Sequence, residues 1–65
     1  MNDIDTLKAE IKKLSTQATQ AKMDLHDLSE ELPINWESIP AVAQKCHDLH
    51  AKLSEARARL KAAQG

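Results

Sequence analysis

Two long helical patterns are separated by one short stretch, Leu32-Pro33-Ile34-Asn35-Trp36-Glu37-Ser38-Ile39-Pro40. Pro33 disfavours helical backbone at the residue before it, so the first helix is expected to end at Leu32. Ser38 can cap a second helix, which tolerates Pro40 because the first turn needs no N–H from that position. The corner, residues 33–38, is so short that it can only return the chain beside itself.

Apolar or small residues alternate in steps of three and four on both sides of this corner. Before it they are Ile4, Leu7, Ile11, Leu14, Ala18, Ala21, Leu25, Leu28 and Leu32. After it they are Ile39, Val42, Cys46, Leu49, Leu53, Ala56, Leu60 and Ala63. This set, which we call the seam, has the a/d spacing of helices that pack side by side. The sequence predicts an all-α fold: a single domain over residues 1–65, an antiparallel hairpin with helices over residues 4–32 and 39–63.

A chain of 65 residues rarely folds alone without disulfides, a metal or a partner subunit. Cys46 is the only cysteine, so no disulfide forms within the chain. Because a single neighbouring helix covers only one side of each seam, we expect two hairpins to form a homodimeric four-helix bundle. Further stacking into a higher oligomer is an open alternative.

Charge supports this association. Residues 22–50 hold two basic and six acidic side chains, net −4, whereas the rest of the chain holds seven basic and four acidic ones, net +3. Position g carries Glu10, Gln17, Asp24 and Glu31 in the first helix and Lys45, Lys52 and Arg59 in the second. Antiparallel helices bring g beside g, so we expect an acidic flank against a basic one. Because the two ends of the hairpin carry opposite net charge, we also expect two hairpins that run in opposite directions.

Composition excludes several kinds of function. The net charge of −1 gives no basic excess that would attract phosphate or anionic lipid. No apolar run approaches 18 residues and no signal peptide is visible, so we expect a cytoplasmic protein without a membrane contact. Gly65 is the only glycine, and a slim bundle offers no concave pocket, so neither enzymatic activity nor a cofactor is expected.

Cys46, His47 and His50 form the one pattern that suggests chemistry, because a thiolate and an imidazole one helical turn apart can share a soft metal ion. A small metal-binding bundle that uses Cys46 and His50 is therefore an alternative. The favoured interpretation is structural, with Cys46 as a small hydrophobe at core position a and His50 at flanking position e. His47 diverges from Cys46 by about 100° on a helix, and no metal is expected.

Met23 indicates a docking surface, and Trp36 allows two interpretations. Met23 occupies the outward position f within the weakly charged stretch 15–23. Trp36 is the only aromatic residue. We interpret it, with Ile34 and Ile39, as a plug for the corner end of the bundle; the alternative is an exposed anchor for a partner.

The stretch around these residues resembles a family of small Rop-like proteins associated with nitrogen fixation in diazotrophic bacteria. The similarity covers most of the chain, is densest over residues 16–44, and includes outward positions such as Met23, His26 and Trp36. The resemblance implies a helical hairpin that associates into a four-helix bundle and is encoded beside genes for nitrogenase maturation and cofactor handling. It carries over no catalytic residue.

We therefore expect a non-enzymatic accessory protein that supports nitrogenase assembly or cofactor handling, with a nitrogenase component or maturation protein as its partner. The expected partner-binding residues are Gln20, Met23, Asp24, His26, Asp27 and Trp36. A Rop-like RNA-binding regulator is the alternative. That function needs basic and stacking side chains on one face, and the neutral or acidic middle of the first helix lacks them, so nucleic acid is not expected.

Overall fold

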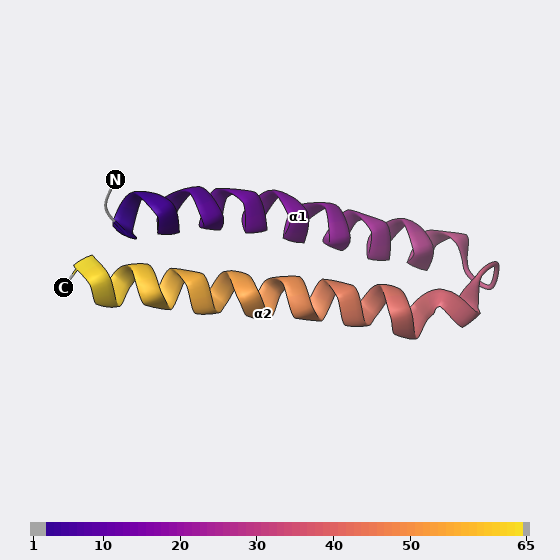
Figure 1. Ribbon diagram of the computed structural model, residues 1–65. Coiled ribbons are helices and arrows are strands. Elements are labelled where there is room, and N and C mark those ends of the chain that lie inside the picture. Colours follow the sequence, from indigo (N-terminus) through magenta and orange to yellow (C-terminus); the bar gives the residue numbers. More distant parts are fainter. Residues whose placement is uncertain (1–2, 65) are drawn as a thin grey trace.

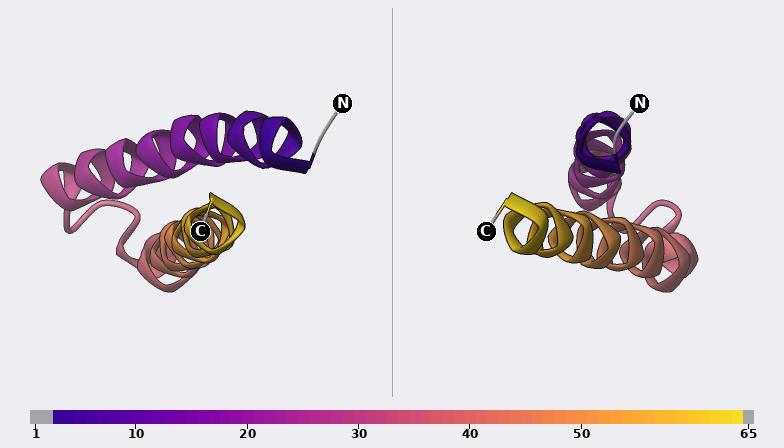
Figure 2. Two further views of the ribbon diagram at one scale, coloured as in Figure 1. Left: turned by 90° about the vertical axis from the view of Figure 1, so that its left-hand side faces the viewer. Right: turned by 60° about the vertical axis from the view of Figure 1, so that its left-hand side comes forward.

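The computed structural model describes residues 3–64 and forms an antiparallel helical hairpin (Figure 1). Helix α1 spans Asp3–Glu31, a single 3₁₀ turn, η1, spans Trp36–Ser38, and helix α2 spans Ile39–Gln64. The Cα atoms extend over 48 × 14 × 13 Å. The two helices run in opposite directions, and their axes cross at an angle (Figure 2). Neither of them has the length and hydropathy of a membrane-spanning segment over the residues described.

Alanine makes up most of the buried part of the helix interface. The buried residues are all members of the seam: Ala18, Ala21, Leu28, Leu53 and Ala56. Most larger seam residues stay half-buried, namely Ile4, Leu7, Ile11, Leu14, Leu25, Val42, Cys46, Leu49 and Leu60. Alanine lets two helix backbones approach closely, and the bulkier side chains then reach the edge of the interface. One side of the larger seam residues therefore remains open to solvent.

The corner is built by local backbone hydrogen bonds. Helix α1 ends at Glu31, one residue before the expected end, and the Ile34 N–H donates to the Glu31 carbonyl at 3.0 Å. The Leu32–Pro33 peptide bond is cis, and Asn35 adopts a left-handed conformation with φ 61°, which asparagine tolerates better than most residues. Ser38 directly precedes α2, as its expected capping position requires, and is also the last residue of η1, a turn that runs directly into α2.

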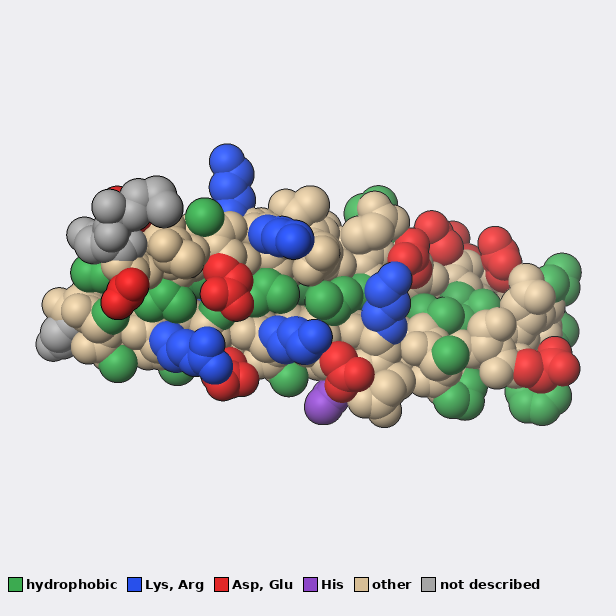
Figure 3. All heavy atoms as spheres, viewed as in Figure 1, with side chains coloured by type: hydrophobic (Ala, Val, Ile, Leu, Met, Phe, Trp, Pro, Cys, Tyr) green, Lys and Arg blue, Asp and Glu red, His purple; other side chains and the backbone are tan. Residues whose placement is uncertain are grey.

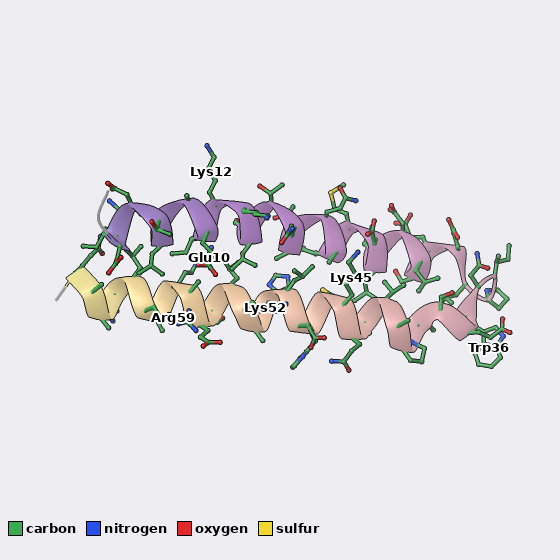
Figure 4. All side chains as sticks on the ribbon, viewed as in Figure 1. Glu10, Lys12, Trp36, Lys45, Lys52 and Arg59 are labelled. Atoms are coloured by element: carbon green, nitrogen blue, oxygen red, sulfur yellow. The ribbon has the colours of Figure 1, made fainter. Side chains whose placement is uncertain are left out.

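Trp36 does not plug the end of the hairpin. Its exposed fraction is 61%, and that of Ile34 is 66%. Every residue over the range 29–41 is exposed, because the corner extends past the region where α1 and α2 cover each other. In the single hairpin the Trp36 side chain is exposed at the tip (Figure 4). The plug at the end of a four-helix bundle stays a prediction.

Candidate functional site

Five of the six residues expected to bind a partner lie on one half of α1. We call this set the outer face of α1: Gln20, Met23, Asp24, His26 and Asp27. All five are exposed. Met23 has an exposed fraction of 53% and lies on the side of the helix opposite the seam, as its heptad position f requires. An apolar side chain thus forms the centre of this face and polar ones surround it.

Hydrogen bonds along the helix order the polar groups around Met23. Gln20 Nε2 donates to Asp24 Oδ1 at 2.9 Å. His26 Nε2 lies 2.9 Å from Glu30 Oε1, and the Ser29 hydroxyl donates to the His26 carbonyl at 2.6 Å. Such exposed pairs three or four residues apart add little stability, typically about 0.3–0.5 kcal/mol each. Their effect is to hold side chains in a defined arrangement on the helix surface.

The g positions of both helices line one flank of the hairpin, as their spacing requires. A shallow groove there is lined by Gln17, Gln20, Ala21, Asp24, Lys45, Leu49 and Lys52. Acidic and basic side chains alternate beside the helix interface (Figure 3), and Glu10 points towards α2 while Lys12 points away from it (Figure 4). The ion pair of Arg59 is formed with Glu55 of its own helix, at 2.6 Å. Residues of the acidic and basic flanks line the same grooves, and Arg59 pairs with a carboxylate of its own helix, one turn away.

Trp36 lies apart from the outer face of α1. Met23 precedes the end of α1 by eight residues, about 12 Å along the axis at 1.5 Å per residue. Trp36 follows that end, on η1, at the tip of the hairpin on the side of α2 (Figure 4). The other large hydrophobic residues exposed at the corner are Leu32, Ile34 and Ile39, and we call these four residues the corner patch. The six expected residues are thus divided between two surfaces, and Leu32, Ile34 and Ile39 join Trp36 on the second.

The cysteine and histidines of α2 do not assemble a ligand set. Cys46 is a free, half-buried thiol, whereas His47 and His50 are exposed. His47 Nδ1 lies 3.4 Å from Asp48 Oδ1, which also accepts a hydrogen bond from Gln44 Nε2 at 2.8 Å. The Gln44 hydrogen bond, followed by that of His47, lowers the pKa of the Asp48 carboxyl from its ordinary value. Over residues 3–64, no three His, Cys, Asp or Glu side chains converge as a metal site requires.

Comparison with known proteins identifies the family. The profile of the family described as Rop-like matches residues 2–65. A UPF0437 protein of Azorhizobium caulinodans is 59% identical over 61 residues, which cover 94% of this chain and 88% of the relative. A UPF0437 protein of Trichormus variabilis is 45% identical over 58 residues, covering 89% and 67%.

A third relative adds a genetic location. It is named UPF0437 protein in nifX-nifW intergenic region, comes from Frankia alni, and is 40% identical over 52 residues, covering 80% of this chain and 63% of its own. No solved structure matches significantly. The profile matches nearly the whole chain, and the helical hairpin with its seam is the fold expected of this family. The chain belongs to the Rop-like family.

Proposed function

We propose that this chain is a non-enzymatic accessory protein of nitrogen fixation, which docks a nitrogenase component or maturation protein on the outer face of α1. The observation that carries the proposal is the exposure of Met23, 53%, in the middle of a long helix and within a polar rim. An apolar centre with a polar rim is the usual anatomy of a protein interface. Methionine suits such a centre because its flexible thioether adapts to the partner's surface.

The pathway is supported by the family. The Frankia alni relative is named for its position between nifX and nifW, and its sequence is 40% identical to this chain over 52 residues. The same small helical architecture beside nitrogen-fixation genes favours a role in nitrogenase assembly or cofactor handling, in the cytoplasm where those steps would occur. The long, narrow hairpin suits a docking role better than catalysis, because a reaction requires a site from which water is largely excluded.

The docking unit in this proposal is a homodimeric four-helix bundle. The accessible surface of the hairpin is 5046 Å². A compact monomer of 7.2 kDa exposes about 4,100 Å². The excess of roughly 900 Å² is close to the area that each partner buries in a standard interface. The half-buried seam residues supply this surface, and a second copy offers the same seam to cover it.

Charge favours hairpins that run in opposite directions. The acidic segment 22–50, net −4, would then lie beside the remaining segments of the partner, net +3. Met23 stays accessible in such a bundle because position f points away from the seam. Both outer faces would then be presented, one from each copy.

A pull-down from cells grown under nitrogen-fixing conditions tests the proposal. We expect the wild-type chain to recover a nitrogenase component or maturation protein, and Met23→Glu to lose it at an unchanged melting temperature. Ala51→Glu is the matched control, since it places the same charge on an exposed position of α2. Equal recovery with Met23→Glu, or recovery of RNA in place of protein, would contradict the proposed surface. Normal growth on dinitrogen by a deletion strain would contradict the role.

A further inference from the structure

The corner patch concentrates exposed apolar surface at the tip of the hairpin. Leu32, Ile34, Trp36 and Ile39 have exposed fractions of 40%, 66%, 61% and 37%. Single exposed hydrophobic residues are normal on protein surfaces, but four of them within eight residues at one end of the hairpin mark a candidate binding site. Leu32 and Ile39 belong to the seam and would be covered in a bundle dimer, whereas Ile34 and Trp36, the two most exposed residues of the patch, lie outside the seam.

The backbone of the corner holds these side chains in one arrangement. The Ile34 N–H donates to the Glu31 carbonyl at 3.0 Å, and the Trp36 N–H donates to the Pro33 carbonyl at 3.4 Å. The Ser38 N–H donates to the Asn35 carbonyl at 2.9 Å. A patch on a fixed backbone loses little conformational entropy when a partner binds, which favours binding.

The surroundings of the patch are acidic. Residues 23–44 contain five Asp or Glu side chains and no Lys or Arg. Glu30 and Glu31 occupy the last turn of α1, which has no basic residue, and Glu37 lies in η1 beside Trp36. The C-terminal end of a helix carries a partial negative charge, so carboxylates there are electrostatically unfavourable. Acidic side chains gather towards this end of the hairpin (Figure 3). In the proposed dimer the basic segments of a second copy, net +3, would offset part of the net −4, and a cationic group brought by a partner would relieve the rest.

We infer that the corner patch binds a polypeptide segment in which apolar side chains are flanked by Lys or Arg. The apolar side chains would cover Ile34 and Trp36, and the basic ones would pair with Glu31 and Glu37. Nucleic acid and anionic membranes would be repelled by the same carboxylates. The inference deepens the proposed function and rests on it for the assumption that this protein acts by binding other proteins.

Trp36 makes the inference directly measurable, because the emission of the only aromatic residue reports on the patch itself. The probe is a short synthetic amphipathic peptide of leucine and lysine. Its matched controls replace lysine with glutamate in one peptide and leucine with serine in another. We expect a saturable blue shift of Trp36 emission with the leucine–lysine peptide alone, weakened by added salt. A shift that grows with chain concentration in the absence of peptide would show that a second copy covers the patch, and would overturn the inference.

Substitutions locate the binding. With a fluorescently labelled peptide, Glu31→Gln and Glu37→Gln should each weaken binding about 1.5- to 5-fold, the range of an exposed ion pair. Ile34→Ser should weaken it about tenfold through lost apolar contact. Asp48→Asn is the matched control, an exposed carboxylate on α2 away from the corner, and should leave binding unchanged. The corner patch would be refuted if Ile34→Ser and Glu37→Gln left peptide binding unchanged, or if the glutamate control peptide bound as well as the leucine–lysine peptide. Loss of nitrogenase proteins with Met23→Glu would then still support the outer face of α1.

Discussion

Replacement of Ala21 by leucine tests the close packing at the centre of the hairpin. Ala21 is 3% exposed, and Ala18 and Ala56 are 1% and 2% exposed, so three more carbon atoms would have to displace neighbouring atoms or extend into the groove that Ala21 also lines. Overpacking of this kind typically lowers the free energy of unfolding by about 1–3 kcal/mol. A domain of this size loses roughly 4–8 °C in melting temperature per kcal/mol, which gives an expected decrease of about 4–24 °C.

The assay is thermal unfolding followed by circular dichroism at 222 nm, at matched chain concentrations. Ala9→Leu is the control, since Ala9 is exposed on the same helix and the change there should alter stability by only a few tenths of a kcal/mol, about the difference in helix propensity. Size-exclusion chromatography of both variants reports any change in association. If Ala21→Leu unfolds at the temperature of wild type and of Ala9→Leu, the alanines do not face a packed helix and the description of the core is wrong.

Three further outcomes are expected. The pKa of Asp48 should lie below 3.8 in a carbon-13 NMR titration and return towards that value in Gln44→Ala. Because the pKa is lowered in the folded state, the small stabilisation of the fold is present above pH 3.8 and is lost as pH falls through the folded pKa. The protein purified without chelators should contain no stoichiometric metal by mass spectrometry, and Cys46→Ser should lower the melting temperature through its half-buried position; zinc, copper or iron that disappears with Cys46→Ser would reverse this expectation. Structured RNA should show no salt-dependent retention on the immobilised protein, whereas retention that falls steeply with salt would favour a Rop-like RNA regulator.

The seam could be predicted from the sequence because its spacing is a local property of each helix. Steps of three and four placed Ala18, Ala21, Leu28, Leu53 and Ala56 on the inner side of the helices, and these residues are buried. The exposure of Leu32 could not be predicted in the same way. It continues the spacing, yet α1 ends at Glu31 and Leu32 is 40% exposed, because burial at a corner depends on what lies opposite.

The candidate surfaces show the same division between local and long-range information. The outward position of Met23 followed from its heptad position. The separation of Trp36 from Met23 depends on the path of the corner, which includes a left-handed Asn35 and a 3₁₀ turn that no periodic pattern indicates. The g positions predicted Arg59 on the flank that faces Glu10, but the ion pair that Arg59 forms is with Glu55 of its own helix.

Sedimentation equilibrium at micromolar concentration measures most directly whether two hairpins cover each other's seam. We predict a mass of twice the 7.2 kDa chain. On dilution we expect dissociation and loss of helicity to occur together, so that no folded monomer accumulates. Assembly into a larger multiple would extend the same packing. A 7.2 kDa monomer that stays helical and unfolds cooperatively would contradict it, because the half-buried seam would then be stable in water without a partner.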